Sequence, residues 1–186
     1  MTEEPKYYTT EGDDGTTGLL GRGRVKKYHP RPMAFGEVDE AQAALGMARA
    51  VMQDRHAAQV VLQVQRDLYY LMAELAATEE VAAQFRRIDA TRVTWLEEQT
   101  DAYGARIRLP AEFTISGDSI PGAALDFART VVRRAERQVV RLYDEGLIQN
   151  GELIRYLNRL SSLLYVLSRY EDALSGQSGV TLAKEV

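Results

Sequence analysis

Three arginines, Arg129, Arg133 and Arg137, are spaced four residues apart in the segment ARTVVRRAER. In a helix of about 3.6 residues per turn they form one stripe, with Glu136 on the same face and Arg134 well off it. Like charges at this spacing repel, so a helix that stacks three guanidiniums gains most from a polyanionic partner. Arginine suits phosphate, because its planar fork donates two parallel hydrogen bonds. The alternative is a solvated face with nearby carboxylates as counter-ions.

A second segment, YTTEGDDGTTG at positions 8–18, combines glycine, threonine and aspartate. Glycine lets backbone N–H groups approach phosphate oxygens closely, and threonine hydroxyls can add hydrogen bonds or contact a magnesium ion. Lys27 follows nearby as a source of positive charge. The segment is not a Walker A loop, because no Gly-Lys-Thr/Ser follows it and no strand precedes it. A flexible tail is the alternative, and composition alone favours that alternative.

Two further segments place polar residues in predicted helices. Glu37 and Glu40 lie near the start of the first helix, where acidic residues complement the helix dipole without any ligand. Asn158 lies between Leu157 and Leu160 in the last helix, although asparagine is a mediocre helix former. It therefore needs either a polar partner inside the bundle or a ligand.

Composition excludes several kinds of chemistry. The 186 residues include no cysteine, which excludes disulfides, thiolate metal sites, iron–sulfur clusters and a cysteine nucleophile. The formal net charge of −4 argues against a dedicated nucleic-acid-binding protein. The two histidines, His29 and His56, have no metal-like neighbours. No apolar run is long enough for a membrane span and the acidic start is unlike a targeting signal, so we expect a cytoplasmic protein.

Helices must position these residues. Apolar residues recur at helical spacing after the first 34 residues, which predicts an all-α fold: a five-helix up-and-down bundle with an extended, glycine-rich N-terminal arm. Ser119 is expected to cap the fourth helix and Gly146 to end it. No strand is expected to have a partner. The expected helices span about 36–56, 59–77, 80–103, 121–144 and 151–174. The expected domains are an arm (1–34), the helical bundle (35–174) and a flexible tail (175–186).

Together these segments resemble one family, the PduO-type ATP:cob(I)alamin adenosyltransferases. The N-terminal motifs of that family are matched here by YTTEGDDGTTGLL, RVKK, PR and AFGEVDE, in that order. Its fourth-helix motif is matched by ARTVVRRAER and its last-helix motif by YLNRLSS. The similarity covers roughly residues 7–172 of the chain.

The resemblance implies a homotrimer of ferritin-like helical bundles with active sites between neighbouring subunits. It implies transfer of the 5′-deoxyadenosyl group of ATP to the cobalt of cob(I)alamin, which gives adenosylcobalamin and triphosphate. ATP, Mg²⁺ and cobalamin are the expected ligands, and the expected protein contact is a hand-off to an adenosylcobalamin-dependent enzyme. Neither nucleic acid nor a membrane is an expected partner.

The resemblance also implies a role for each motif residue. Mg²⁺ is expected to be held mainly by the ATP phosphates, with Glu136 as a candidate contact. Asp39 is expected to pair with Arg129 across the subunit boundary. Phe113 is expected to occupy the lower face of the corrin and displace its dimethylbenzimidazole ligand. The residues expected to bind ATP are Thr9, Thr10, Glu11, Gly12, Asp13, Gly15, Thr17, Gly18 and Lys27 in the arm, with Arg133, Arg134, Glu136 and Arg137 at the triphosphate and Asn158 at the nucleoside.

The segment after Phe113 departs from the family pattern. Where the family often has an apolar pair followed by Pro-Gly-Gly, this chain has TISGD at positions 114–118. Because this segment flanks the corrin, the departure favours an alternative function, a non-catalytic carrier or sensor bundle that keeps ATP or corrinoid binding. The presence of every polar residue named above favours the enzyme.

Overall fold

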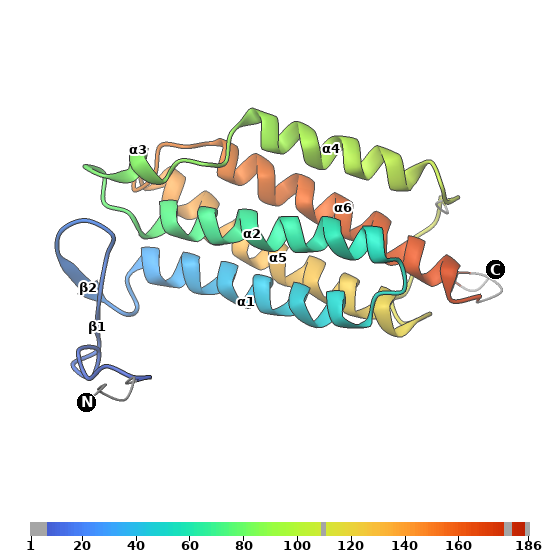
Figure 1. Ribbon diagram of the computed structural model, residues 1–186, viewed down its shortest axis with the longest axis horizontal. Coiled ribbons are helices and arrows are strands. Elements are labelled where there is room, and N and C mark those ends of the chain that lie inside the picture. The colour runs from blue at the N-terminus through green and yellow to red at the C-terminus, as the bar shows by residue number, and fades with distance from the viewer. Residues whose placement is uncertain (1–6, 109–110, 177–179, 185–186) are drawn as a thin grey trace, which may run out of the picture.

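The computed structural model describes residues 7–108, 111–176 and 180–184. Five long helices pack side by side into a bundle (Figure 1), which confirms the predicted all-α architecture. A one-turn helix, α3, lies between the second and third of them. In chain order the elements are β1 (Thr16–Gly18), β2 (Arg24–Lys26), α1 (Pro30–Val51), α2 (Arg55–Ala76), α3 (Ala82–Phe85), α4 (Ala90–Gly104), α5 (Ile120–Asp144) and α6 (Glu152–Leu174).

The N-terminal arm contains a small β-hairpin, so the expectation that no strand has a partner was wrong. β1 and β2 pair antiparallel, with Thr17 opposite Val25. Gly21 and Gly23, in the connecting loop, have φ angles of 113° and 98° that other residues rarely adopt. The strands are three residues long, too short to give a readable alternation of apolar and polar residues.

α1 begins at Pro30, earlier than the predicted start at residue 36. Two prolines, Pro30 and Pro32, lie in its first turn. Proline is tolerated in a first helical turn, because the backbone N–H groups there have no partner within the helix. His29 caps the helix, since its Nδ1 accepts a hydrogen bond from the Arg31 backbone N–H at 3.2 Å. The Arg31 guanidinium is buried and donates to the Leu75 carbonyl at 2.8 Å, which joins α1 to the end of α2.

The predicted single helix over 80–103 is interrupted, and its two parts are α3 and α4. Ile88 turns into the core at the break, and the Asp89 carboxylate accepts from the backbone N–H of Thr91 at 3.0 Å to start α4. The predicted ends of α5 are confirmed. Ser119 accepts from the Gly122 N–H at 3.0 Å, and Gly146 follows the helix with a φ of 69°.

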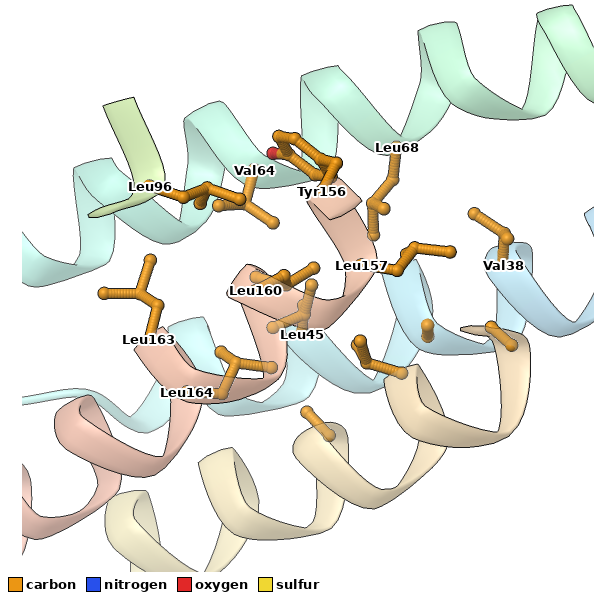
Figure 2. Close-up of a cluster of buried hydrophobic side chains, with 14 of the residues drawn as sticks. Val38, Leu45, Val64, Leu68, Leu96, Tyr156, Leu157, Leu160, Leu163 and Leu164 are labelled. Carbon is orange, nitrogen blue, oxygen red and sulfur yellow. The ribbon is translucent and has the colours of Figure 1, made fainter. Parts of the chain in front are cut away.

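The core lies between all five long helices, and Figure 2 shows the buried leucines and valines that fill its centre. A buried polar contact also joins the helices: the Tyr156 hydroxyl of α6 donates to Asp67 of α2 at 2.8 Å, and Arg92 of α4 pairs with the same carboxylate. Because a buried charge is costly unless it is paired, this contact fixes the relative position of three helices. None of the described helices is long and apolar enough to cross a membrane.

Candidate functional site

The hairpin arm carries a shallow pocket of about 320 Å³. Most of the arm residues predicted to bind ATP line it: Thr9, Glu11, Gly12, Asp13, Thr17, Gly18 and Lys27. Thr10 and Gly15 instead shape the turns around it, since their carbonyls accept from the backbone N–H groups of Asp13 and Lys27 at 3.2 and 3.0 Å. The predicted arm residues are therefore brought together, with backbone groups and one lysine facing a common space.

Two further residues, Thr16 and Arg24, line the same pocket and were missed from the sequence. Arg24 donates from Nη2 to the Glu11 carbonyl at 2.6 Å and from Nε to the Thr16 hydroxyl at 2.9 Å. It thus ties the start of the arm to β1 and adds positive charge beside Lys27. Arg24 lies in the RVKK motif, and the register of the hairpin places it in the pocket. Strands of three residues are too short for this register to be predicted from the sequence.

The hairpin is attached to the end of α2 of its own chain. The Leu20 N–H donates to the Ala76 carbonyl at 2.9 Å, and the Thr78 N–H donates to the Leu20 carbonyl at 2.8 Å. Gly21 follows, and a Cβ at this position would lie 2.3 Å from the Thr78 Oγ1. Only glycine therefore allows this close approach, which sets the position of the arm pocket relative to the bundle.

The α5 stripe divides into exposed and paired arginines. Arg133 and Arg137 are exposed, and neither has an ion pair among the residues that the structure describes. Their one mutual contact is a hydrogen bond from Arg137 Nη1 to the Arg133 carbonyl at 2.9 Å. Two guanidiniums thus lie one turn apart with free donors, as a bound polyphosphate requires.

Arg134 lies off this stripe and pairs with Glu40 and Glu37 of α1. Arg134 donates hydrogen bonds to both carboxylates, and these bonds, first the one to Glu40 and then the one to Glu37, raise the pKa of Arg134 above its usual range. The expectation that both glutamates serve the helix dipole was wrong, because α1 begins at Pro30 and places them beyond its first turn. In this chain Arg134 joins α1 to α5.

Asn158 of α6 has a polar partner within the bundle. Its side-chain amide donates to Glu136 of α5 at 3.0 Å, and its carbonyl oxygen accepts from Arg159 at 3.0 Å. Arg159 also donates to Glu97 of α4 at 2.8 Å. This chain of contacts runs from α4 through α6 to α5, and it orients Glu136 beside the exposed arginine stripe.

Arg129 and Asp39 are not paired with each other within the chain. Arg129 pairs with Asp126, one turn earlier in α5, while Asp39 is exposed on α1. The Ser116 hydroxyl donates to the other oxygen of the Asp126 carboxylate. Arg129 is therefore connected through Asp126 to the segment that follows Phe113.

A second pocket, of about 380 Å³, lies at the loop before α5. Its lining joins the loop residues Glu112 and Phe113 to Arg129 of α5 and Tyr165 of α6. The Phe113 side chain is 88% exposed, which is costly for a large apolar group in water. Phe113 and Arg129, which the family resemblance names as site residues, therefore line one pocket, and the Phe113 ring is left open to solvent.

The arm, beside the start of α1, and the loop before α5 lie at opposite ends of the bundle (Figure 1), and each of these segments lines one of the two pockets. The exposed arginines of α5 lie between these ends. Within the described ranges, no group of three or more histidine, aspartate or glutamate side chains is arranged to hold a metal ion. The chain thus has one pocket near each end of the bundle, and the exposed arginines Arg133 and Arg137 lie on α5 between them.

Comparison with known proteins assigns these features to one family. A family model for cobalamin adenosyltransferases matches residues 7–171. The corrinoid adenosyltransferase PduO of Salmonella typhimurium is 37% identical over 174 residues, which are 93% of this chain and 52% of that protein. The corrinoid adenosyltransferase of Mycobacterium tuberculosis H37Rv is 41% identical over 170 residues, 88% of this chain and 87% of that protein. The chain thus spans about half the length of the PduO relatives.

Solved structures agree with the sequence comparison. A variant of the PduO-type ATP:corrinoid adenosyltransferase from Lactobacillus reuteri, complexed with cobalamin and ATP, matches with a TM-score of 0.90 and 30% identity over 97% of both chains. A second variant of that enzyme, complexed with ATP, matches with a TM-score of 0.87 and 30% identity over 95% of this chain and 99% of that one. The matched region includes the arm, the arginine stripe and the Phe113 loop, and the chain belongs to the cobalamin adenosyltransferase family.

Proposed function

We propose that this chain is an ATP:corrinoid adenosyltransferase, which moves the 5′-deoxyadenosyl group of ATP to the cobalt of cob(I)alamin. The observation that carries the proposal is the pair Arg133 and Arg137, exposed on α5 with no counter-ion among the described residues. A triphosphate supplies the charge that this pair lacks. Family membership and the ATP and cobalamin complexes of the Lactobacillus reuteri enzyme support the choice of substrates.

In the proposed reaction no side chain of the protein needs to act as the nucleophile. Cob(I)alamin is itself a strong nucleophile, so the cofactor carries the hard step. An electron pair on cobalt forms the bond to C5′ of ATP, the C5′–O bond breaks, and its electron pair leaves on triphosphate as Co(I) becomes Co(III). The chain aligns the two reactants and stabilises the leaving charge, a task that suits Arg133 and Arg137.

The arm binds ATP in this proposal. Its pocket offers Lys27 and Arg24 as cations, together with the threonine hydroxyls and backbone groups around Gly12 and Gly18. Mg²⁺ enters as the counter-ion of ATP, held mainly by phosphate oxygens. Glu136 is the candidate protein contact for that ion, since Asn158 holds its carboxylate beside the stripe.

The corrin lies against Phe113 in this proposal. An 88% exposed phenylalanine gains apolar contact when the lower face of a corrin covers it. It then occupies the space of the axial dimethylbenzimidazole nitrogen. Removing that nitrogen lowers the electron density on cobalt(II) and makes its reduction to cobalt(I) easier.

A homotrimer completes the site in this proposal. The arm pocket and the Phe113 pocket lie at opposite ends of one chain, so a single chain does not enclose both substrates. A closed ring of head-to-tail neighbours brings the arm of one subunit to the Phe113 end of the next. Asp39, exposed on α1, then pairs with Arg129 of the neighbour. Sedimentation tests this arrangement, and a monomer under turnover conditions would contradict it.

The proposal places the reaction in the cytoplasm, because reduced cobalt needs a reducing compartment, and the product passes to an adenosylcobalamin-dependent enzyme. The alternative function is a carrier or sensor that binds ATP and corrinoid without turnover. The unusual segment 114–118 favours that alternative.

A single spectrum separates the two functions. The protein is mixed anaerobically with ATP, Mg²⁺ and chemically reduced cob(I)alamin, and the light-sensitive absorbance of adenosylcobalamin is followed. ATP-dependent product that requires the protein is the expected result. ATP binding by calorimetry without product would favour the carrier, and absence of both would contradict the whole proposal.

A further inference from the structure

Residues 180–184, the C-terminal strand, pair through an isolated β-bridge with the loop that carries Phe113. The Ala183 N–H donates to the Phe113 carbonyl at 2.7 Å, and the Ile115 N–H donates to the Thr181 carbonyl at 2.8 Å. Between these bonds, Thr114 and Leu182 lie opposite each other in an antiparallel bridge. The C-terminal end of the chain thus reaches the same end of the bundle as this loop (Figure 1) and fixes the backbone on both sides of Thr114.

A carboxylate in the loop holds this C-terminal strand in place. Asp118 accepts from the Thr181 hydroxyl at 2.6 Å and from the Thr181 N–H at 3.1 Å. On its other side Asp118 faces Arg169 of α6, which is buried and lies 3.8 Å away. Arg169 in turn pairs with Asp172 at 3.0 Å. The C-terminal strand is therefore connected to a buried charge in the last helix.

The same loop is fixed to α5 by Ser116. Its hydroxyl donates to Asp126, the carboxylate that pairs with Arg129. Ser116 and Asp118 both belong to the segment in which this chain departs from the family pattern. The departing residues thus form two attachments, one to α5 and one to α6 and the C-terminal strand.

We propose that Asp118 and the C-terminal strand 180–184 position Phe113 for the corrin substrate. They are positioning residues, because they hold the backbone of Phe113 and do not face its pocket. The inference rests on the proposed function. It predicts that disturbing these residues slows turnover of cob(II)alamin, because that step requires displacement of the axial dimethylbenzimidazole nitrogen. ATP binding should stay unchanged.

Two variants of the full chain test this role, each with a matched control. Ala183→Pro removes the N–H that donates to Phe113, and Lys184→Pro places the same residue at an exposed neighbouring position. Thr181→Val removes the hydroxyl that binds Asp118, and Thr181→Ser keeps it. The readouts are turnover with cob(II)alamin and a mild reductant, turnover with chemically reduced cob(I)alamin, the KM for ATP, and amide exchange of Ile115.

We expect Ala183→Pro and Thr181→Val to lower cob(II)alamin turnover by about fivefold or more, which is about 1 kcal/mol or more. The KM for ATP and the cob(I)alamin rate should stay within about twofold. Ile115 should exchange faster in both variants, and both controls should behave as wild type. Electron paramagnetic resonance of bound cob(II)alamin should show more of the axial nitrogen splitting in the two variants.

Two results would overturn the inference. Wild-type turnover of cob(II)alamin in both variants would show that the strand does not position Phe113. Equal exchange of Ile115 in wild type and Ala183→Pro would show that the strand does not hold the loop. Failure of the proposed function has a different signature: the wild-type chain would then form no product even from cob(I)alamin, while amide exchange would still report on the strand.

Discussion

The side-chain amide of Asn158 donates to Glu136 at 3.0 Å and joins α6 to α5 beside the exposed arginine stripe. The asparagine is thereby satisfied inside the protein, as a polar group among leucines must be. The same bond occupies the Glu136 carboxylate, while Arg133 and Arg137 form no ion pair within the part of the chain that the structure describes. In the proposed function, a negative side chain beside the phosphate-binding arginines is tolerated because Asn158 orients it and shares its charge.

The first prediction concerns the two free arginines. Arg133→Ala or Arg137→Ala should weaken ATP binding by about tenfold or more, because a charge-assisted hydrogen bond contributes about 1.5–3 kcal/mol. Arg155→Ala is the control, since Arg155 is an exposed arginine that pairs with Glu152 on α6. Calorimetry with ATP measures the effect. Unchanged affinity in both stripe variants would refute the phosphate role.

The second prediction concerns Phe113. Phe113→Ala should lower turnover of cob(II)alamin with a mild reductant by about tenfold or more, while ATP affinity stays within about twofold. The physical reason is the loss of the apolar group that occupies the axial ligand position. Tyr69→Ala, which truncates another exposed aromatic on α2, is the control. Equal losses in cob(II)alamin turnover and ATP affinity would mean that Phe113 has a structural role only and does not displace the axial ligand.

The elements of the bundle followed from the sequence because helical spacing of apolar residues reports directly on which face is buried. The start of α1 did not, since proline marks both loops and first helical turns, and only the His29 cap decides between them. The contacts of Arg134 with Glu37 and Glu40 could not be predicted from the sequence either. They depend on how α1 and α5 align along their lengths, which no local pattern encodes.

The candidate site was predictable where motif residues are close in the chain, as in the arm pocket. It was not predictable where remote segments meet. Nothing in the sequence around Asp118 indicates that Thr181, far along the chain, binds its carboxylate. The cross-subunit pairing of Asp39 and Arg129 remains a prediction, because it requires a second chain.

The third prediction concerns the attachment of the arm to α2. Gly21→Ala should weaken ATP binding more than Gly23→Ala, by about fivefold or more, with the same helical content. Both glycines have positive φ, so both variants carry backbone strain. Only at Gly21 does the added Cβ also meet the Thr78 hydroxyl, while no atom lies within 4 Å at Gly23. Equal affinities in the two variants would mean that attachment to α2 does not position the arm pocket.

The fourth prediction concerns the charge pair in the core. Arg92→Met should lower the free energy of unfolding by about 3 kcal/mol, because it leaves Asp67 buried without its cation. Arg155→Met, which breaks an exposed pair, should cost at most about 1 kcal/mol. Chemical denaturation of the two variants measures the difference. Similar losses would show that water reaches Asp67.

The fifth prediction concerns pH and the C-terminal strand. The Thr181 hydroxyl, more than any other group, lowers the pKa of Asp118 below its usual 3.8. Because the ionised form is favoured when the strand is bound, this contact is fully present above about pH 3.8 and is lost as pH falls through the lowered pKa. Carboxyl carbon NMR should therefore show Asp118 titrating at a higher pH in Thr181→Val than in wild type, with Thr181→Ser unchanged. An identical midpoint in Thr181→Val would mean that the hydroxyl does not hold Asp118 in solution, and the C-terminal strand would then lack the attachment that the structure shows.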